Sequence, residues 1–68
     1  MEEITVFNAD SKEIYELIAI WYDDSLWFED IDVYQNGYDV IIESPIQATD
    51  SILNVLYNDA YNYKVLWD

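Results

Sequence analysis

The amino-acid sequence predicts an α+β fold in which four strands form one antiparallel sheet and two helices cover it. An Asn36-Gly37 pair separates two runs rich in β-branched and aromatic residues, which is the strongest short-range signal of a β-hairpin. One segment with a helical apolar period precedes this hairpin and another follows it. Short alternating segments stand near both ends of the chain.

The hairpin is expected to occupy residues 26–44, with Asn36-Gly37 as a two-residue type I′ turn. Counting outward from the turn places Val33 opposite Val40 on an apolar face, which Ile31, Ile42, Trp27 and Tyr38 extend. The other face is acidic. It carries four carboxylates with three apolar or aromatic side chains between them: Asp30, Asp32, Asp39 and Glu43, with Phe28, Tyr34 and Ile41.

The expected register crowds negative charge. It sets Asp30 directly opposite Glu43, and no Lys or Arg stands nearby in the sequence. Like charges at opposed strand positions destabilise the pair of strands. The pattern therefore indicates that these carboxylates serve a purpose other than stability.

Residues 4–7 predict a first strand, and Asp10 or Ser11 can cap the helix that follows it. The apolar stripe of this helix has the i, i+3, i+4, i+7 spacing of a helix packed on a sheet: Ile14, Leu17, Ile18 and Trp21. Its acidic residues are expected to face solvent: Glu13, Glu16, Asp23 and Asp24.

After Pro45 a second helix is expected, capped by Thr49 or Asp50, and residues 61–67 alternate as a last strand. The order β-α-β-β-α-β defines the split βαβ, or ferredoxin-like, architecture, with both helices on one face of the sheet. The acidic face of the hairpin is then uncovered. A three-stranded sheet, with the first or last segment unpaired or paired in a dimer, is the alternative.

Length and charge limit the partners. The 68 residues make one small domain, residues 1–68, and 15 acidic residues against 2 basic ones give a formal charge of −13. Direct binding to nucleic acid or to an anionic membrane requires the Lys and Arg that this chain lacks. A basic protein is the natural partner, and a homodimer that covers the aromatic residues stays open.

The side chains needed for most catalysis are missing. The chain has no histidine, no cysteine and a single glycine, Gly37, so it lacks an imidazole base, a thiolate, an ordinary zinc site and a glycine-rich phosphate loop. The segment 30–34 begins like a calcium-binding loop, but it lacks the required glycine and the closing Glu. We expect no catalytic residue, no cofactor and no metal site.

The absence of cysteine fits a reducing compartment. Met1-Glu2-Glu3 has neither the positive start nor the long apolar run of a signal peptide, and no apolar run reaches membrane-spanning length. These features predict a cytoplasmic protein.

In size and charge the chain resembles the small acidic DNA-mimic inhibitors made by bacteriophages and mobile elements: anti-CRISPR proteins, anti-restriction proteins and inhibitors of uracil-DNA glycosylase. The resemblance covers composition, and it transfers no individual residue because these inhibitors have unrelated folds. It implies an inhibitor that works in the cytoplasm of the host cell.

The leading hypothesis is therefore a DNA mimic that blocks the basic nucleic-acid-binding groove of a CRISPR effector, restriction enzyme or repair enzyme. The expected partner-binding residues are the hairpin set Asp30, Asp32, Asp39, Glu43, Phe28 and Tyr34, and the helix set Glu13, Glu16, Asp23 and Asp24. An immunity protein or antitoxin that neutralises a basic nuclease toxin is one alternative. A protein-interaction adaptor and a merely solubilising surface are the others.

Overall fold

A computed structural model gives the structure of this chain and describes residues 1–66. Within these residues seven elements follow one another: strand β1 (Glu2–Val6), helix α1 (Ser11–Tyr22), a 3₁₀ turn η1 (Phe28–Asp30), strands β2 (Asp32–Asn36) and β3 (Asp39–Ser44), helix α2 (Ile46–Asn58) and strand β4 (Tyr63–Leu66). None of the helices within residues 1–66 has the length and apolar character needed to cross a membrane.

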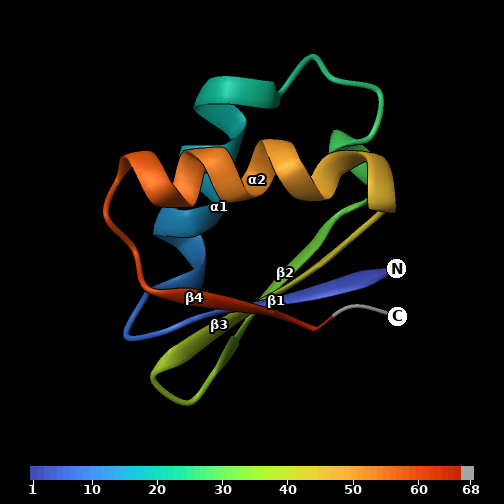
Figure 1. Cartoon of the computed structure of the whole chain (residues 1–68). Helices are drawn as coiled ribbons and strands as arrows, with labels where there is room; N and C mark the ends of the chain where they lie inside the picture. Colours follow the sequence, from blue (N-terminus) through green and yellow to red (C-terminus); the bar gives the residue numbers. More distant parts are fainter. Residues whose placement is uncertain (67–68) are drawn as a thin grey trace.

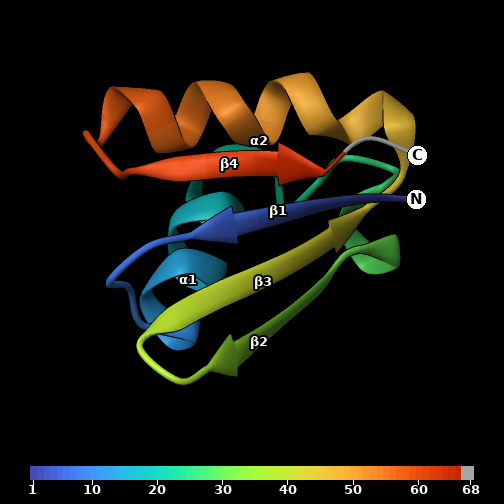
Figure 2. The ribbon, with the colours of Figure 1, turned by 60° about the horizontal axis from the view of Figure 1, so that its bottom comes forward.

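The four strands form one antiparallel sheet in the order β2-β3-β1-β4. Helix α1 connects β1 to β2 across β3, and helix α2 connects β3 to β4 across β1. Both helices lie on the same side of the sheet (Figure 1), and the view onto the strands shows β4, β1, β3 and β2 in spatial order (Figure 2). The predicted ferredoxin-like α+β fold is confirmed.

The hydrophobic core fills the space between the sheet and the helices. It takes alternate residues from the two central strands, because successive side chains of a strand point to opposite faces. Its fully buried members come from four elements: Ile4 and Val6 of β1, Val40 and Ile42 of β3, Ile14 and Ile18 of α1, and Ala48, Ile52 and Leu56 of α2.

The predicted position of the hairpin turn is wrong by one residue. The loop is Gly37-Tyr38, and Asn36 pairs with Asp39 as the last rung of the ladder. Within the loop only Gly37 has a positive φ, +66°, as a type II′ turn requires at its first central residue, whereas type I′ needs positive φ at both. The register moves by two residues, so the side chains of the paired residues, 32–36 and 39–43, keep their predicted faces.

The predicted strand across residues 26–31 is also wrong. Phe28 lies in η1, and its ring packs on the ring of Tyr15 with the centroids 5.4 Å apart. The ring of Trp27 packs on Tyr22 in the same way, at 5.1 Å. The aromatic pair thus fills the space beside α1 instead of extending the sheet. Asp30, at the end of η1, is therefore not opposite Glu43.

Trp21, expected in the core, is 54% exposed in the last turn of α1, and Trp27 and Phe28 pack against the core instead. Trp67, at the end of the expected last strand, lies outside the described residues. Helix α2 begins at Ile46, directly after Pro45, so Thr49 is inside the helix rather than its cap. The buried Thr49 hydroxyl lies 3.2 Å from Ser44 Oγ and donates to the Pro45 carbonyl.

Candidate protein-binding surface

The face of the sheet turned away from the helices carries three carboxylates side by side on three adjacent strands. Glu43 of the central strand β3 lies opposite Asp32 of β2 on one side and opposite Glu3 of β1 on the other. We call Asp32, Glu43 and Glu3 the carboxylate row. Adjacent strands are about 4.8 Å apart, so each pair in this row is closer than a Debye length in ordinary buffers.

The row sits on this face because its members alternate with core residues. Glu3 stands between the buried Glu2 and Ile4, and Glu43 stands between the buried Ile42 and Ser44. Glu3 and Glu43 are half-buried by their neighbours on the central strands, whereas Asp32 on the edge strand is exposed. The register of the sheet therefore holds the three charges in fixed positions.

A second row runs beside the first, with Tyr34 of β2, Ile41 of β3, Thr5 of β1 and Lys64 of β4 in order across the sheet. Ile41 is only 7% exposed although no helix covers it, while Tyr34 is 41% exposed. Lys64 is one of the two basic residues of the chain and lies at the far edge strand, opposite Thr5. The face thus combines an apolar centre with a strongly acidic side.

The hydroxyl of Tyr34 lies close to the carboxylate row, and its pKa is raised by partial burial and by the negative charges there. Its hydroxyl donates a long hydrogen bond, 3.5 Å, to Glu43 Oε2. Partial burial, followed by the negative charges of Glu43 and Glu3, raises the pKa of Tyr34 above its ordinary value of 10.0. The direction is the one expected beside several uncompensated carboxylates, because a phenolate there would add one more negative charge.

The other hairpin residues expected at the surface separate into two groups. Asp39 shares the sheet face with Asp32, Tyr34 and Glu43, but it stands near the turn, where its Oδ1 accepts the Asn8 backbone N–H at 3.1 Å. Asp30 and Phe28 lie off the sheet in η1, and the Phe28 ring is half-buried.

The expected acidic set on the first helix is exposed but dispersed. Glu13 and Glu16 lie on α1, Asp23 is its C-terminal cap residue and Asp24 follows in a turn. Negative charge at a helix C-terminus opposes the helix dipole, and no basic residue occupies the last turn of α1. Glu13 and Glu16 are neighbours near the start of α1, whereas Asp23 and Asp24 lie past its other end, and Glu13 also lines a separate hollow.

Glu3 completes the row, and the sequence reasoning missed it. The first strand was expected to begin at Ile4, whereas β1 begins at Glu2. A signal was present, since Glu3 and Thr5 continue the alternation of Ile4 and Val6. The open hollow at the end of the row, about 250 Å³ in volume, is lined by Met1, Glu2, Glu3, Glu43 and Leu66.

The geometry offers charge display rather than ligand coordination. Among residues 1–66, no three His, Cys, Asp or Glu side chains form a group that could hold a metal ion. The carboxylates of the row lie along a line across the strands and do not converge on one point. Such an array suits contact with several positive groups distributed over a partner's surface.

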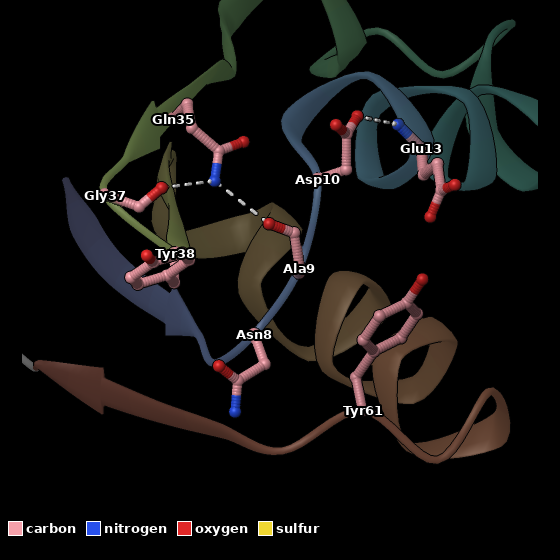
Figure 3. Close-up of a pocket in the computed structure, with 8 residues that line it drawn as sticks. All are labelled: Asn8, Ala9, Asp10, Glu13, Gln35, Gly37, Tyr38 and Tyr61. Atoms are coloured by element: carbon pink, nitrogen blue, oxygen red, sulfur yellow. Dashed lines mark hydrogen bonds between the residues drawn. The ribbon is translucent and has the colours of Figure 1, made fainter.

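A second unforeseen feature is the role of Gln35, whose side chain joins three segments. Its Nε2 lies 3.0 Å from the Ala9 and Gly37 carbonyl oxygens and 2.9 Å from that of Asp39, and its Oε1 accepts the Ser11 N–H at 2.8 Å. The hairpin turn is thereby fixed to the start of α1 (Figure 3). Sequence alone shows only a polar residue beside a turn.

Comparisons with known proteins add no relative to this description, because no protein-family model, no curated protein and no solved structure matches the chain.

Proposed function

We propose that this protein is an acidic inhibitor that mimics DNA and occupies the basic nucleic-acid-binding groove of a host defence or DNA-processing protein. The observation that supports the proposal most is the carboxylate row, in which Glu3, Glu43 and Asp32 stand next to one another on an uncovered sheet face. Nucleic-acid-binding grooves carry Lys and Arg spaced to meet a line of phosphates. A line of carboxylates presents the same sign of charge to them.

The energetic argument concerns the cost of this arrangement. Opposed like charges destabilise adjacent strands, and here two such oppositions share Glu43. A partner's positive charge offsets this repulsion in the complex. Binding is therefore favoured by relief of the repulsion as well as by direct attraction between the two proteins. The overall charge of −13 adds long-range attraction and raises the association rate with a basic protein.

The second row, beside the carboxylates, supplies apolar and aromatic contact area for a partner. Tyr34 and Ile41 place an aromatic ring and an aliphatic side chain beside the carboxylates. Aromatic residues are enriched among those that contribute most to protein–protein affinity. In this proposal Tyr34 is the anchor, while the row determines register and attraction. The acidic residues of the helix set and Asp30 contribute only to the long-range attraction that the net negative charge exerts on a basic partner.

The proposal places the protein in the cytoplasm of a host cell, encoded by a phage or another mobile element. Small size and extreme negative charge support this assignment, as they are shared with the known class of phage-encoded DNA mimics. An immunity protein would bind a nuclease toxin by similar chemistry.

Competition with DNA tests the proposal. The immobilised protein is exposed to host lysate at 50 mM salt, captured proteins are identified, and each is purified and assayed for DNA binding with and without this protein. We expect a DNA- or RNA-binding partner whose nucleic acid is displaced stoichiometrically, with affinity that falls steeply as salt rises. A partner that binds nucleic acid equally well in the complex would refute mimicry, and a dedicated nuclease toxin would favour the immunity reading.

A further inference from the structure

An open hollow of about 470 Å³ lies at the end of the sheet, where the hairpin turn meets the start of α1. Its lining comes from the segment before α1, from Glu13 in the first turn of α1, from the hairpin with Tyr38 and from Tyr61 before β4 (Figure 3). The hollow is separate from the carboxylate row, since the two share no lining or member residue.

The backbone hydrogen-bond donors at the start of α1, beside this hollow, are already used within the chain. The backbone N–H groups of Lys12 and Glu13 donate to Asp10 Oδ1 at 2.9 and 3.3 Å, and the Ser11 N–H donates to Gln35 Oε1. The N-terminus of a helix ordinarily attracts anions through such amides. Here Asp10 and Gln35 occupy them, and the Gln35 amide group is itself held by carbonyl oxygens.

The remaining polar side chains of the lining are the Asn8 amide, the Tyr38 and Tyr61 hydroxyls and the Glu13 carboxylate, and of these only the carboxylate carries a charge. The Glu13 carboxylate and the Tyr61 ring lie on the same side of the hollow (Figure 3). Burial, followed by the charges of Glu13, Asp59 and Asp10, raises the pKa of Tyr61 above 10.0, which agrees with a negative field at this place. Tyr38 stands at the rim, 87% exposed. An occupant that matches this lining is positively charged, rich in donors and able to stack on a ring.

We propose that the hollow binds the guanidinium group of an arginine side chain presented by another protein. A guanidinium is planar, carries five N–H donors in a fixed fork and stacks on aromatic faces, whereas an ammonium group is a compact and strongly hydrated point charge. In this proposal the N–H groups of the guanidinium donate to the Glu13 carboxylate, and its planar face stacks on the tyrosine rings. That this arginine belongs to the basic partner proposed above rests on the proposed function, but binding of the side chain itself does not.

Titration with a single blocked amino acid tests the inference. N-acetyl-arginine amide is added to the ¹⁵N-labelled protein and amide shifts are followed by NMR, with the neutral isostere N-acetyl-citrulline amide as the matched ligand control. We expect saturable shifts confined to residues around the hollow with the arginine derivative only. Citrulline shifts of equal affinity, or shifts spread evenly over all acidic surfaces, would overturn the proposal. So would equal binding of N-acetyl-lysine amide.

Two variants locate the site. Glu13→Gln is expected to weaken arginine binding about tenfold, the effect of losing one hydrogen bond to a charged group. Glu29→Gln makes the same change in charge in η1, beyond the far end of α1 and outside the lining of the hollow, and it is expected to leave the affinity within about twofold. Equal weakening by both variants would reduce the effect to general charge and overturn the assignment.

The test separates this inference from the proposed function. A variant with the row neutralised, Glu3→Gln with Glu43→Gln, retains the whole lining of the hollow. It should bind the arginine derivative as the wild-type protein does, whether or not it still displaces DNA from a partner. Loss of arginine binding in this variant, with an unchanged fold by NMR, would show that the hollow has no specificity of its own.

Discussion

Glu3 and Glu43 lie directly opposite each other on the two central strands of the sheet, and Asp32 continues the line on the edge strand. An ordinary sheet places opposite charges or neutral residues at such positions, because opposed like charges raise the free energy of the folded state. In this protein the repulsion falls on the two central strands of the sheet. The charges therefore belong to the surface chemistry of the protein and not to its stabilisation.

Removal of one charge from this line is expected to stabilise the protein. Glu3→Gln ends the opposition to Glu43 and should raise the free energy of unfolding by about 0.5 kcal/mol in 20 mM salt, with a smaller gain at 500 mM. Urea denaturation at the two salt concentrations measures both values. Glu16→Gln on α1 is the control with equal net charge, and a gain as large there would show that position on the sheet is irrelevant.

The turn glycine is expected to be required for its backbone conformation alone. A Cβ on Gly37 would meet no atom within 4 Å, but its φ of +66° is costly for an L-residue with a side chain. Gly37→Ala should lower stability by about 1 kcal/mol, and Gly37→Asn should cost less because Asn tolerates positive φ. Thermal unfolding followed by circular dichroism gives the comparison. An alanine variant as stable as wild type would contradict the assigned turn.

Gln35 is expected to tolerate no acceptor in place of its amide nitrogen. Gln35→Glu would bring a carboxylate oxygen against the Ala9, Gly37 and Asp39 carbonyl oxygens and remove their donor. We expect a loss of about 1 kcal/mol in unfolding free energy, the usual net contribution of a hydrogen bond, because Gln35 is exposed to solvent. Gln47→Glu, in the exposed first turn of α2, adds the same charge where the helix dipole favours it and should cost nothing. Equal effects of the two substitutions would refute the role of Gln35.

Stability is expected to fall at alkaline pH through Tyr34 and Tyr61. The folded state raises the pKa of both hydroxyls above 10.0, so it retains protons that the unfolded chain has released. This contribution is complete below pH 10 and is lost as the pH rises through the folded pKa values. Absorbance titration of phenolate should show a late component that is reduced in Tyr34→Phe and in Tyr61→Phe. Loss of stability beginning well below pH 10 would not come from these groups.

The order of elements was predictable from sequence because it depends on local signals. The apolar stripe through Ile14 and Ile18, the Asp10 cap and the alternation through Val40 and Ile42 each indicate one element, and β-α-β-β-α-β then leaves few topologies. The two faces of the paired part of the hairpin, residues 32–36 and 39–43, were also predictable, since a shift of two residues keeps their side chains on the same sides.

The features that could not be predicted from the sequence depend on contacts between segments that are distant along the chain. The position of the turn is fixed by Gln35, which bonds to Ala9 and Ser11, and these are joined to it only in the folded chain. The aromatic packing of Trp27 and Phe28 on α1 replaces a strand that the residue types alone favour. Glu3 enters the row through pairing of β1 with β3, which links residues about forty positions apart.

The proposed DNA mimicry is tested most directly by comparing two variants of equal charge against one captured partner. The row variant carries Glu3→Gln, Asp32→Asn and Glu43→Gln, and the helix variant carries Glu16→Gln, Asp23→Asn and Asp24→Asn. Isothermal titration at 100 mM salt gives the Kd of each complex. We predict that the row variant binds at least about thirtyfold more weakly than the helix variant, as the loss of three charge pairs near an interface implies. Equal affinities of the two variants would contradict the role of the carboxylate row.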